Sequence, residues 1–406
     1  MSGVATRDEV VIVGAARTAF SRFGGILKDT SSVDLAVTVV KEALGRARLR
    51  PDQVDALYLG QTLHAEIANH LNVPARQVSL KAGFPASTLS LTVDRACCSS
   101  MTALQLAFKD IRSGEASVVV AAGVENLSRV PLLAPYRLRW GCGLGSVTLE
   151  DPVFEIGYDG WKPVALEAGE VALEYGLDRE AQDRWALASQ QRYARAVAEG
   201  RFAEEIVPVV VPQKRGEPIV FEKDEFPRPD TTLEALARLK TIYGSPTVTA
   251  GNAPGLDTGA SALLLMSGSR AREMGLAPLA TVAGIGSAAV DPRYMACGPA
   301  EAIRVALRRV QLSVSDLELL EINEAFAAVT LVSIRVLSEG DTAREEDLRS
   351  RTNVNGGAVA VGHPVGASGA RIVLTMICEL RRRGGGYGAA AICGGLGQAD
   401  AVIVRV

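Results

Sequence analysis

The sequence predicts an α/β protein whose two equivalent halves stack into five layers, α/β/α/β/α, with an inserted loop subdomain. Three features lead to this fold class. Strand-like and helical segments alternate near the N-terminus, one helix–strand unit recurs near the C-terminus, and the middle of the chain differs in composition. At 406 residues the chain is long enough for two or three domains and can bury a large core without disulfides.

The alternation begins at the first apolar run. Residues 9–18, EVVIVGAART, are rich in β-branched residues and end in small ones, as buried strands do. A helical pattern follows over 31–49, and then 54–61 is strand-like and 65–82 helical. This order predicts a mostly parallel sheet with helices on both faces.

The recurring unit occupies residues 99–124. It consists of small residues, an amphipathic helix, a Gly-containing turn, a buried strand and a terminal glycine. Residues 367–395 repeat that order at nearly the same spacing. Two such units predict two equivalent halves that pack together.

The middle segment, 128–256, contains all three tryptophans and is loop-rich and more charged than its surroundings. Within it, a strong helix is expected from Asp178 as N-cap to Gly200 as C′ residue. Because of the tryptophans, we expect an inserted subdomain with a core rather than a surface excursion. The predicted units are an N-terminal half (1–127 with 257–278), the insert (128–256) and a C-terminal half (279–406).

The charge balance excludes several classes of protein. A net charge of −3 and a pI near 5.8 argue against a partner that is a nucleic acid or an anionic membrane. The longest apolar runs fall far short of the ~20 residues that a membrane span needs, and no signal-peptide pattern precedes the first strand. We therefore expect a cytoplasmic protein.

The six cysteines are expected to be reduced thiols rather than disulfides or metal ligands. Cys97 and Cys98 are adjacent and the others stand far apart, which fits no zinc pattern. His64 and His70 are six residues apart, so a helix would place them on different faces. No metal site is predicted.

The adjacent cysteines lie between a strand-like run and the helix that begins near Ser99. A helix N-terminus stabilises a thiolate, so we expect a lowered pKa and a nucleophilic thiol there. This argument does not separate Cys97 from Cys98, and a small buried cysteine is the alternative for either.

Three further segments carry groups suited to thiol chemistry. The glycine-rich run 353–371 surrounds His363, which is suited to act as a base. Cys393 is followed by two glycines, whose uncovered N–H groups suit an oxyanion hole. Asn323 and Glu324 end another strand-like run, where Asn could hold a water or carbonyl, or cap a helix.

Together these segments closely resemble the thiolase family, in family order and across nearly the whole chain. The matching stretches are ARTAFSRFGGILKD (16–29), NVPARQ (72–77), VDRACCSSMTA (93–103), AAGVENLS (121–128), TVTAGNAPG (247–255), INEAF (322–326), NGGAVAVGHPVGASGAR (355–371) and CGGLG (393–397).

The resemblance implies a role for each residue of the site. Cys97 takes the nucleophile position, and Cys98 stands where the family usually has a small residue. His363 matches the histidine that activates the nucleophile and helps to bind the thioester oxygen. Asn323 matches the residue that positions a water in that first oxyanion hole.

It also implies the reaction. Cys393 matches the second catalytic cysteine, an acid and base, and the N–H of Gly395 matches the partner of the Cys97 N–H in a second oxyanion hole. The implied activity is CoA-dependent cleavage of 3-oxoacyl-CoA to acyl-CoA and acetyl-CoA, or the reverse Claisen condensation, through an acyl-cysteine with ping-pong kinetics. Coenzyme A is a substrate, and no permanently bound cofactor is implied.

The chain departs from the family pattern around the substrate. VALEAG (164–169) replaces the common MGxTAE, and Pro254 replaces a serine of GNASG. Arg228 falls at a position that contacts the CoA nucleotide, and Met295 and Phe326 fall at pocket-lining positions; a surface arginine and two core residues are the alternatives. We therefore expect an acyl group other than simple acetoacetyl: branched, aromatic or carboxylated.

Other members of this fold suggest the competing functions. A ketoacyl synthase would need two histidines in the C-terminal half, where only His363 occurs. The remaining alternatives are an enzyme that needs an accessory subunit and a non-catalytic acyl-CoA-binding scaffold. The resemblance implies a homodimer or homotetramer whose partners are acyl-CoA, acetyl-CoA and CoA.

Overall fold

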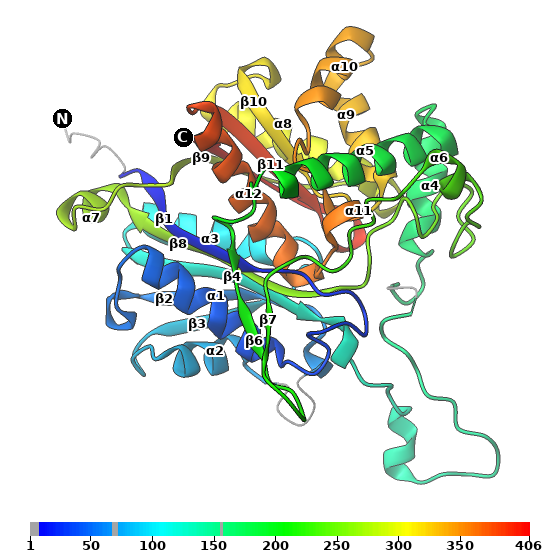
Figure 1. The fold of residues 1–406 in the computed structure, drawn as a ribbon, viewed down its shortest axis with the longest axis horizontal. Helices are drawn as coiled ribbons and strands as arrows, with labels where there is room; N and C mark the ends of the chain where they lie inside the picture. Colours follow the sequence, from blue (N-terminus) through cyan, green and yellow to red (C-terminus); the bar gives the residue numbers. More distant parts are fainter. Residues whose placement is uncertain (1–7, 67–71, 155–156) are drawn as a thin grey trace.

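A computed structural model describes residues 8–66, 72–154 and 157–406 (Figure 1). Its centre is a ten-stranded mixed sheet, of which nine strands form one path and β5 (Ile206–Val207) pairs with β1 beside it. In sheet order the nine strands are β10 (Leu317–Ile322), β11 (Tyr387–Cys393), β12 (Gln398–Arg405), β9 (Ala280–Ala289), β1 (Val10–Thr18), β8 (Thr258–Ser267), β4 (Val118–Asn126), β2 (Ala56–Gly60) and β3 (Leu89–Val93).

The sheet consists of two halves with the same pairing. In the N-terminal half β4 is parallel to β2 and antiparallel to β8, and in the C-terminal half β11 is parallel to β10 and antiparallel to β12. The halves join through two antiparallel residue pairs between β1 and β9. The predicted duplication is confirmed, and Figure 1 shows the blue-to-cyan half beside the yellow-to-red half.

The expectation of a mostly parallel sheet is wrong. Five of the nine strand pairings in the sheet are antiparallel, namely β1–β8, β1–β9, β4–β8, β9–β12 and β11–β12. The reason is visible at β11 and β12, where a turn over Gly395–Gly397 reverses the chain with no crossover helix.

The helices complete five layers. Apolar residues of α1 (Ser32–Arg46) and α2 (Pro74–Ala82) share one core with the outer face of the N-terminal strands. A second core joins α3 (Ser99–Ser113) and α12 (Ser368–Arg383) to strands of both halves, and a third lies under α8 (Gly298–Val310) and α9 (Ala327–Ser338). The pair α3 and α12 is therefore the middle layer, and both helices begin near the junction of the halves.

The helix ends follow from local sequence. Ser31 caps α1 by accepting a hydrogen bond from the Val33 N–H. In the expected helix 65–82, the described α-helical part is α2, whose first residue is Pro74, and residues 64–66 form a 3₁₀ turn. His70 lies outside the described residues.

The inserted segment wraps the body instead of forming a core around its tryptophans. The predicted helix is α5 (Arg179–Ala198), which begins at its N-cap Asp178 and is followed by Gly200 at φ 69°. Trp185 on this helix packs into the core of the C-terminal half. Trp140 and Trp161 are 80% and 50% exposed, so the expectation of a tryptophan core is wrong.

Part of the insert projects from the body as an arm (130–153), which Figure 1 shows in teal. The rest of the insert and the remaining helices are short elements that pack around the two halves. These are α4 (Val164–Glu174), β6 (Val209–Val211), β7 (Ile219–Phe221), α6 (Leu233–Ala237), α7 (Gly268–Glu273), α10 (Thr342–Arg351) and α11 (Ala358–Val361).

Neither a membrane-crossing helix nor a cluster of metal ligands occurs among the described residues. No helix among them has the length and apolar character to cross a bilayer. No group of three or more His, Cys, Asp or Glu side chains among them is arranged to hold a metal ion.

Candidate active site

A cavity of about 390 Å³ opens where the two halves meet the insert. Six of the eight site residues expected from the sequence line it: Cys97, Arg228, Met295, Phe326, His363 and Cys393. The other two lie directly behind this lining. Asn323 is in contact with His363, and Gly395 follows the lining residue Gly394.

Cys97 stands just before α3, which begins at Ser99 with Cys98 as its N-cap. The preceding residue, Ala96, has a φ of 51°, in the left-handed region that few non-glycine residues adopt. This tight bend sets the Cys97 Sγ against the cavity, 3.1 Å from the Nε2 of His363. Cys98 is buried, and its thiol donates to the carbonyl of Ile392 at 3.4 Å. The structure thus separates two cysteines that local sequence did not.

His363 is held from both sides. Its backbone N–H donates to Asp257 Oδ2 at 2.7 Å. Its Nδ1 lies 2.5 Å from the Ser368 hydroxyl, which is 3.1 Å from the carbonyl of Pro364. Since that carbonyl can only accept, the hydroxyl donates to it and accepts from Nδ1–H. The lone pair of Nε2 is then free to take the proton of Cys97.

The pKa shifts of both members of this pair favour their neutral forms. Burial raises the pKa of the Cys97 thiol well above its usual range, and the nearby Cys393 raises it further. Burial, helped by the charge of Arg371, lowers the pKa of His363 to about 3. The expected lowering of the Cys97 pKa is therefore wrong, because desolvation outweighs the helix N-terminus here. Proton transfer has to accompany attack on a substrate.

Cys393 ends β11, and its side chain is buried at the cavity wall. Burial raises the pKa of this thiol to about 12, so it is a neutral proton donor. Beyond it, the N–H of Gly394 donates to the carbonyl of Gln398 at 2.6 Å. Among the described residues, neither the N–H of Cys97 nor that of Gly395 donates to the backbone of another residue. Two backbone donors beside the nucleophile are thus available to a ligand.

Asn323 follows β10 and is fixed by its backbone N–H, which donates to the carbonyl of Ala391. Its Nδ2 lies 3.5 Å from the His363 Nε2, and its buried Oδ1 has no partner among the described residues. The neighbouring Glu324 is fully buried and structural, because its carboxylate accepts four hydrogen bonds. Their donors are Trp185 Nε1, Ser189 Oγ, Asn353 Nδ2 and the Val359 N–H.

The residues that depart from the family pattern also lie at this cavity. Val164, Ala165 and Pro254 all line it. Arg228 lies at its wall with the guanidinium 5.6 Å from the ring of Phe226. Apart from the catalytic side chains, the lining is mainly apolar or aromatic, and it includes Tyr158, Tyr243 and Leu256.

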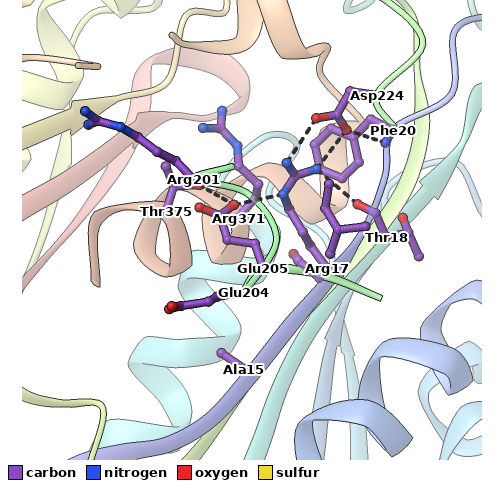
Figure 2. Close-up of polar contacts among 12 residues, drawn as sticks. Ala15, Arg17, Thr18, Phe20, Arg201, Glu204, Glu205, Asp224, Arg371 and Thr375 are labelled. Carbon is purple, nitrogen blue, oxygen red and sulfur yellow. Dashed lines mark hydrogen bonds and ion pairs between the residues drawn. The ribbon is translucent and has the colours of Figure 1, made fainter. Parts of the chain in front are cut away.

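Sequence reasoning missed a buried ion network behind the site (Figure 2). Arg17 of β1 donates from Nε to Glu205 at 2.9 Å and from Nη1 to Asp224 at 2.8 Å. Asp224 also accepts from the Phe20 N–H, and Thr375 of α12 donates to Glu205. The network ties β1 and α12 to the segment that carries the lining residues Phe226 and Arg228. The only sequence signal was the position of Arg17 within the motif 16–29, because its partners are about 200 residues away.

Tyr158 and Asp257 were missed as well. Tyr158 follows a stretch of the insert with no regular pattern, so nothing local marked it. Asp257 lies beside the TVTAGNAPG motif, and its contact with His363 joins residues 106 positions apart. From the sequence alone, a single aspartate beside a motif does not indicate that it contacts a site residue such as His363.

Comparisons with known proteins agree with this architecture. Residues 10–269 match the thiolase N-terminal domain and residues 276–406 the thiolase C-terminal domain. An acetyl-CoA acetyltransferase of Cupriavidus necator is 43% identical over 97% of this chain and 99% of its own length. A beta-ketoadipyl-CoA thiolase of Pseudomonas knackmussii is 44% identical over 98% of this chain and 99% of its own.

Solved structures give the same result. The crystal structure of human mitochondrial 3-ketoacyl-CoA thiolase is 38% identical with a TM-score of 0.92, and the match covers 99% of this chain and 100% of the human one. The chain belongs to the thiolase family.

Proposed function

We propose that this protein cleaves 3-oxoacyl-CoA with coenzyme A to give acyl-CoA and acetyl-CoA, and catalyses the reverse Claisen condensation. The observation that carries this proposal is the pairing of the Cys97 Sγ with the unprotonated His363 Nε2 at 3.1 Å, at a cavity that Cys393 also lines. A nucleophile, a base and a separate acid are the three groups that the reaction needs.

In the first half-reaction, Cys97 gives its proton to the Nε2 of His363 and attacks the 3-keto carbon. The bond between C2 and C3 breaks, and the electron pair leaves on the enolate of acetyl-CoA. The Cys393 thiol protonates that enolate and becomes a thiolate, while the acyl group stays on Cys97 as a thioester.

In the second half-reaction, the Cys393 thiolate takes the proton of coenzyme A. The CoA thiolate attacks the acyl-cysteine, and Cys97 leaves and recovers its proton from His363. Both cysteines end as thiols, so the cycle closes without an added oxidant or cofactor, and coenzyme A is a substrate. Because the first product leaves before CoA reacts, the kinetics are ping-pong.

Two sets of hydrogen-bond donors stabilise the negative charge that develops during the reaction. The N–H groups of Cys97 and Gly395, which are uncommitted within the described residues, receive the oxygen of the acyl group. The Nε2 of His363 with Asn323, through a water, receives the thioester oxygen of the enolate. Hydrogen bonds in a cavity of low polarity stabilise such charges more than they do in water.

For the acyl group we retain the prediction of a branched, aromatic or carboxylated substituent. Val164, Ala165 and Pro254 support it because the departures from the family pattern lie at the cavity. The beta-ketoadipyl-CoA thiolase among the relatives carries a name consistent with a carboxylated acyl group. Equal or better turnover of acetoacetyl-CoA than of bulkier 3-oxoacyl-CoAs would contradict the prediction.

Several features remain proposals that follow from the family. They are CoA nucleotide binding by Arg228, pocket roles for Met295 and Phe326, a cytoplasmic homodimer or homotetramer, and the division into two halves with an insert at 128–256.

The test is mass spectrometry after a brief exposure of the purified chain to 3-oxoacyl-CoA without free CoA. An acyl adduct on the peptide that contains Cys97, released by added CoA, supports the proposed enzyme. Absence of an adduct would favour the acyl-CoA-binding scaffold. An adduct that turns over only with a second protein would favour an enzyme that needs an accessory subunit.

A further inference from the structure

Tyr158 belongs to the insert and lines the same cavity as Cys97, His363 and Cys393. Its phenol lines the cavity with Cys97 and Cys393. A β-carbon built on Gly395 would stand 2.5 Å from the phenol oxygen and 3.1 Å from the ring carbon that bears it. The phenol oxygen therefore lies against the α-carbon of Gly395, in the space that a β-carbon there would take.

The phenol oxygen has no hydrogen-bond partner among the described residues, although the side chain is half-buried. A tyrosine hydroxyl that faces a ligand cavity without a protein partner is free to donate a hydrogen bond to a ligand. The backbone N–H groups of Cys97, on the same cavity, and of Gly395, against which the phenol lies, donate to no other described residue. Three donors without acceptors therefore face the same part of the cavity, next to the nucleophilic sulfur.

The protonation state of the phenol fits a donor. Burial raises its pKa, and the nearby Cys97 and Cys393 raise it further. The phenol thus stays protonated when either cysteine becomes a thiolate during the cycle. A neutral O–H beside a site of developing negative charge stabilises that charge without carrying a competing one.

We propose that the Tyr158 hydroxyl is a third hydrogen-bond donor to the oxygen of the acyl-cysteine, beside the N–H groups of Cys97 and Gly395. The proposal rests on the proposed function, because it needs an acyl group on Cys97. It makes Tyr158 a catalytic residue supplied by the insert, in addition to those from the two halves.

The principal variant is Tyr158→Phe, which removes only the oxygen, with Tyr136→Phe as a matched control. Tyr136 lies in the arm and is 86% exposed, so its hydroxyl contacts no part of the site. Rapid-quench experiments give the rates of acylation and of CoA-dependent deacylation separately. We expect both rates to fall in Tyr158→Phe by roughly 10- to 100-fold, at or below the loss for one oxyanion-hole donor. The KM of Tyr158→Phe for CoA should stay within about twofold of the wild-type value. Both rates of Tyr136→Phe should also stay within about twofold of the wild type.

A spectroscopic measurement reports on the hydrogen bond itself. The acyl-enzyme is prepared with a ¹³C-labelled carbonyl, and its stretching band is read by infrared difference spectroscopy. Loss of a donor should move this band to higher wavenumber in Tyr158→Phe and leave it unchanged in Tyr136→Phe. A purely structural role of Tyr158 would not shift the band. Tyr158→Leu serves as the second variant should the first be poorly folded, and it should show the same shift.

The outcomes separate the two proposals. Failure of the wild type to acylate on Cys97 would remove the proposed function. If the wild type acylates normally, unchanged rates and an unchanged carbonyl band in Tyr158→Phe overturn the role of Tyr158 alone. A rate loss that varies with the acyl group while the band stays fixed also overturns it, and would make Tyr158 a contact of the acyl chain.

Discussion

The two halves of the molecule share one topology but supply different parts of the site. In the N-terminal half, the junction before α3 carries Cys97. In the C-terminal half, the junction before α12 carries His363, and the end of β11 carries Cys393. The same frame thus places two helix starts against one cavity, one with the proposed nucleophile and the other with the proposed base.

The ends of the equivalent strands β4 and β11 carry different residues and make different contacts. Where β11 ends in Cys393 and two glycines, the equivalent β4 ends in Glu125 and Asn126. The fully buried Glu125 accepts hydrogen bonds from Thr62 and Leu63 of its own half and from the Gly366 N–H of the other. One strand end therefore carries the proposed acid, and its counterpart fixes the loop that follows His363. The two halves therefore have equivalent strand ends, which differ in the contacts they make.

The strongest way to break this division is to remove the nucleophile. Cys97→Ala should lower thiolytic turnover by at least roughly 10⁴-fold, since the covalent route is lost. The acyl adduct should also disappear in mass spectrometry. The matched control is Cys98→Ala, which should keep the adduct and most of the turnover because its thiol faces Ile392. The reverse pattern would assign the nucleophile to Cys98.

Removal of the acid in the other half should separate the two kinds of chemistry. Cys393→Ala should lose less in the acylation of Cys97 by a simple acyl-CoA than in cleavage of a carbon–carbon bond. Cys393 serves both steps, but a CoA thiolate can leave without being protonated, whereas the enolate has to gain or lose a proton at carbon. Cleavage of 3-oxoacyl-CoA and exchange of the α-protons of acetyl-CoA should fall by roughly 10²- to 10⁴-fold. Proton exchange is measured by NMR in D₂O. Equal loss of acylation and exchange would contradict this difference between the two steps.

The third prediction concerns the contribution of the buried ion network around Arg17 to the stability of the protein. Arg17→Met should lower the free energy of unfolding by roughly 3–5 kcal/mol, because Glu205 and Asp224 would remain buried without a counter-charge. Chemical denaturation measures this change. Arg50→Met removes a fully exposed partner of Asp52 and should leave the unfolding midpoint unchanged. Equal stability of the two variants would mean that the network contributes little.

The smallest expected effect concerns pH. Since burial raises the Cys97 pKa and lowers that of His363, the free enzyme holds a neutral pair rather than a thiolate and an imidazolium. The thiolate fraction at neutral pH is then below that of an ordinary cysteine. Alkylation of Cys97 by iodoacetamide should therefore keep rising with pH, by about tenfold per unit, to beyond pH 9. A plateau near neutral pH would instead support the ion pair that the helix start predicted.

Much of the fold could be read from the sequence. The repeated helix–strand unit predicted the two halves, and Asp178 and Gly200 marked the ends of α5, because caps and periodicity are local. The same local reasoning assigned a core to tryptophans that are mostly exposed, and it predicted a mostly parallel sheet where β8 and β12 run antiparallel to their neighbours. Strand direction depends on the path between strands, which local pattern does not contain.

For the site, the sequence by itself determined the residue types and the family motifs that contain Cys97, His363, Asn323 and Cys393. Only the tertiary structure decided which of two adjacent thiols faces the cavity, what the pKa values are, and which distant groups complete the site. These properties depend on desolvation and on contacts between residues 100 to 300 positions apart. Such contacts exist only once both halves and the insert have packed together.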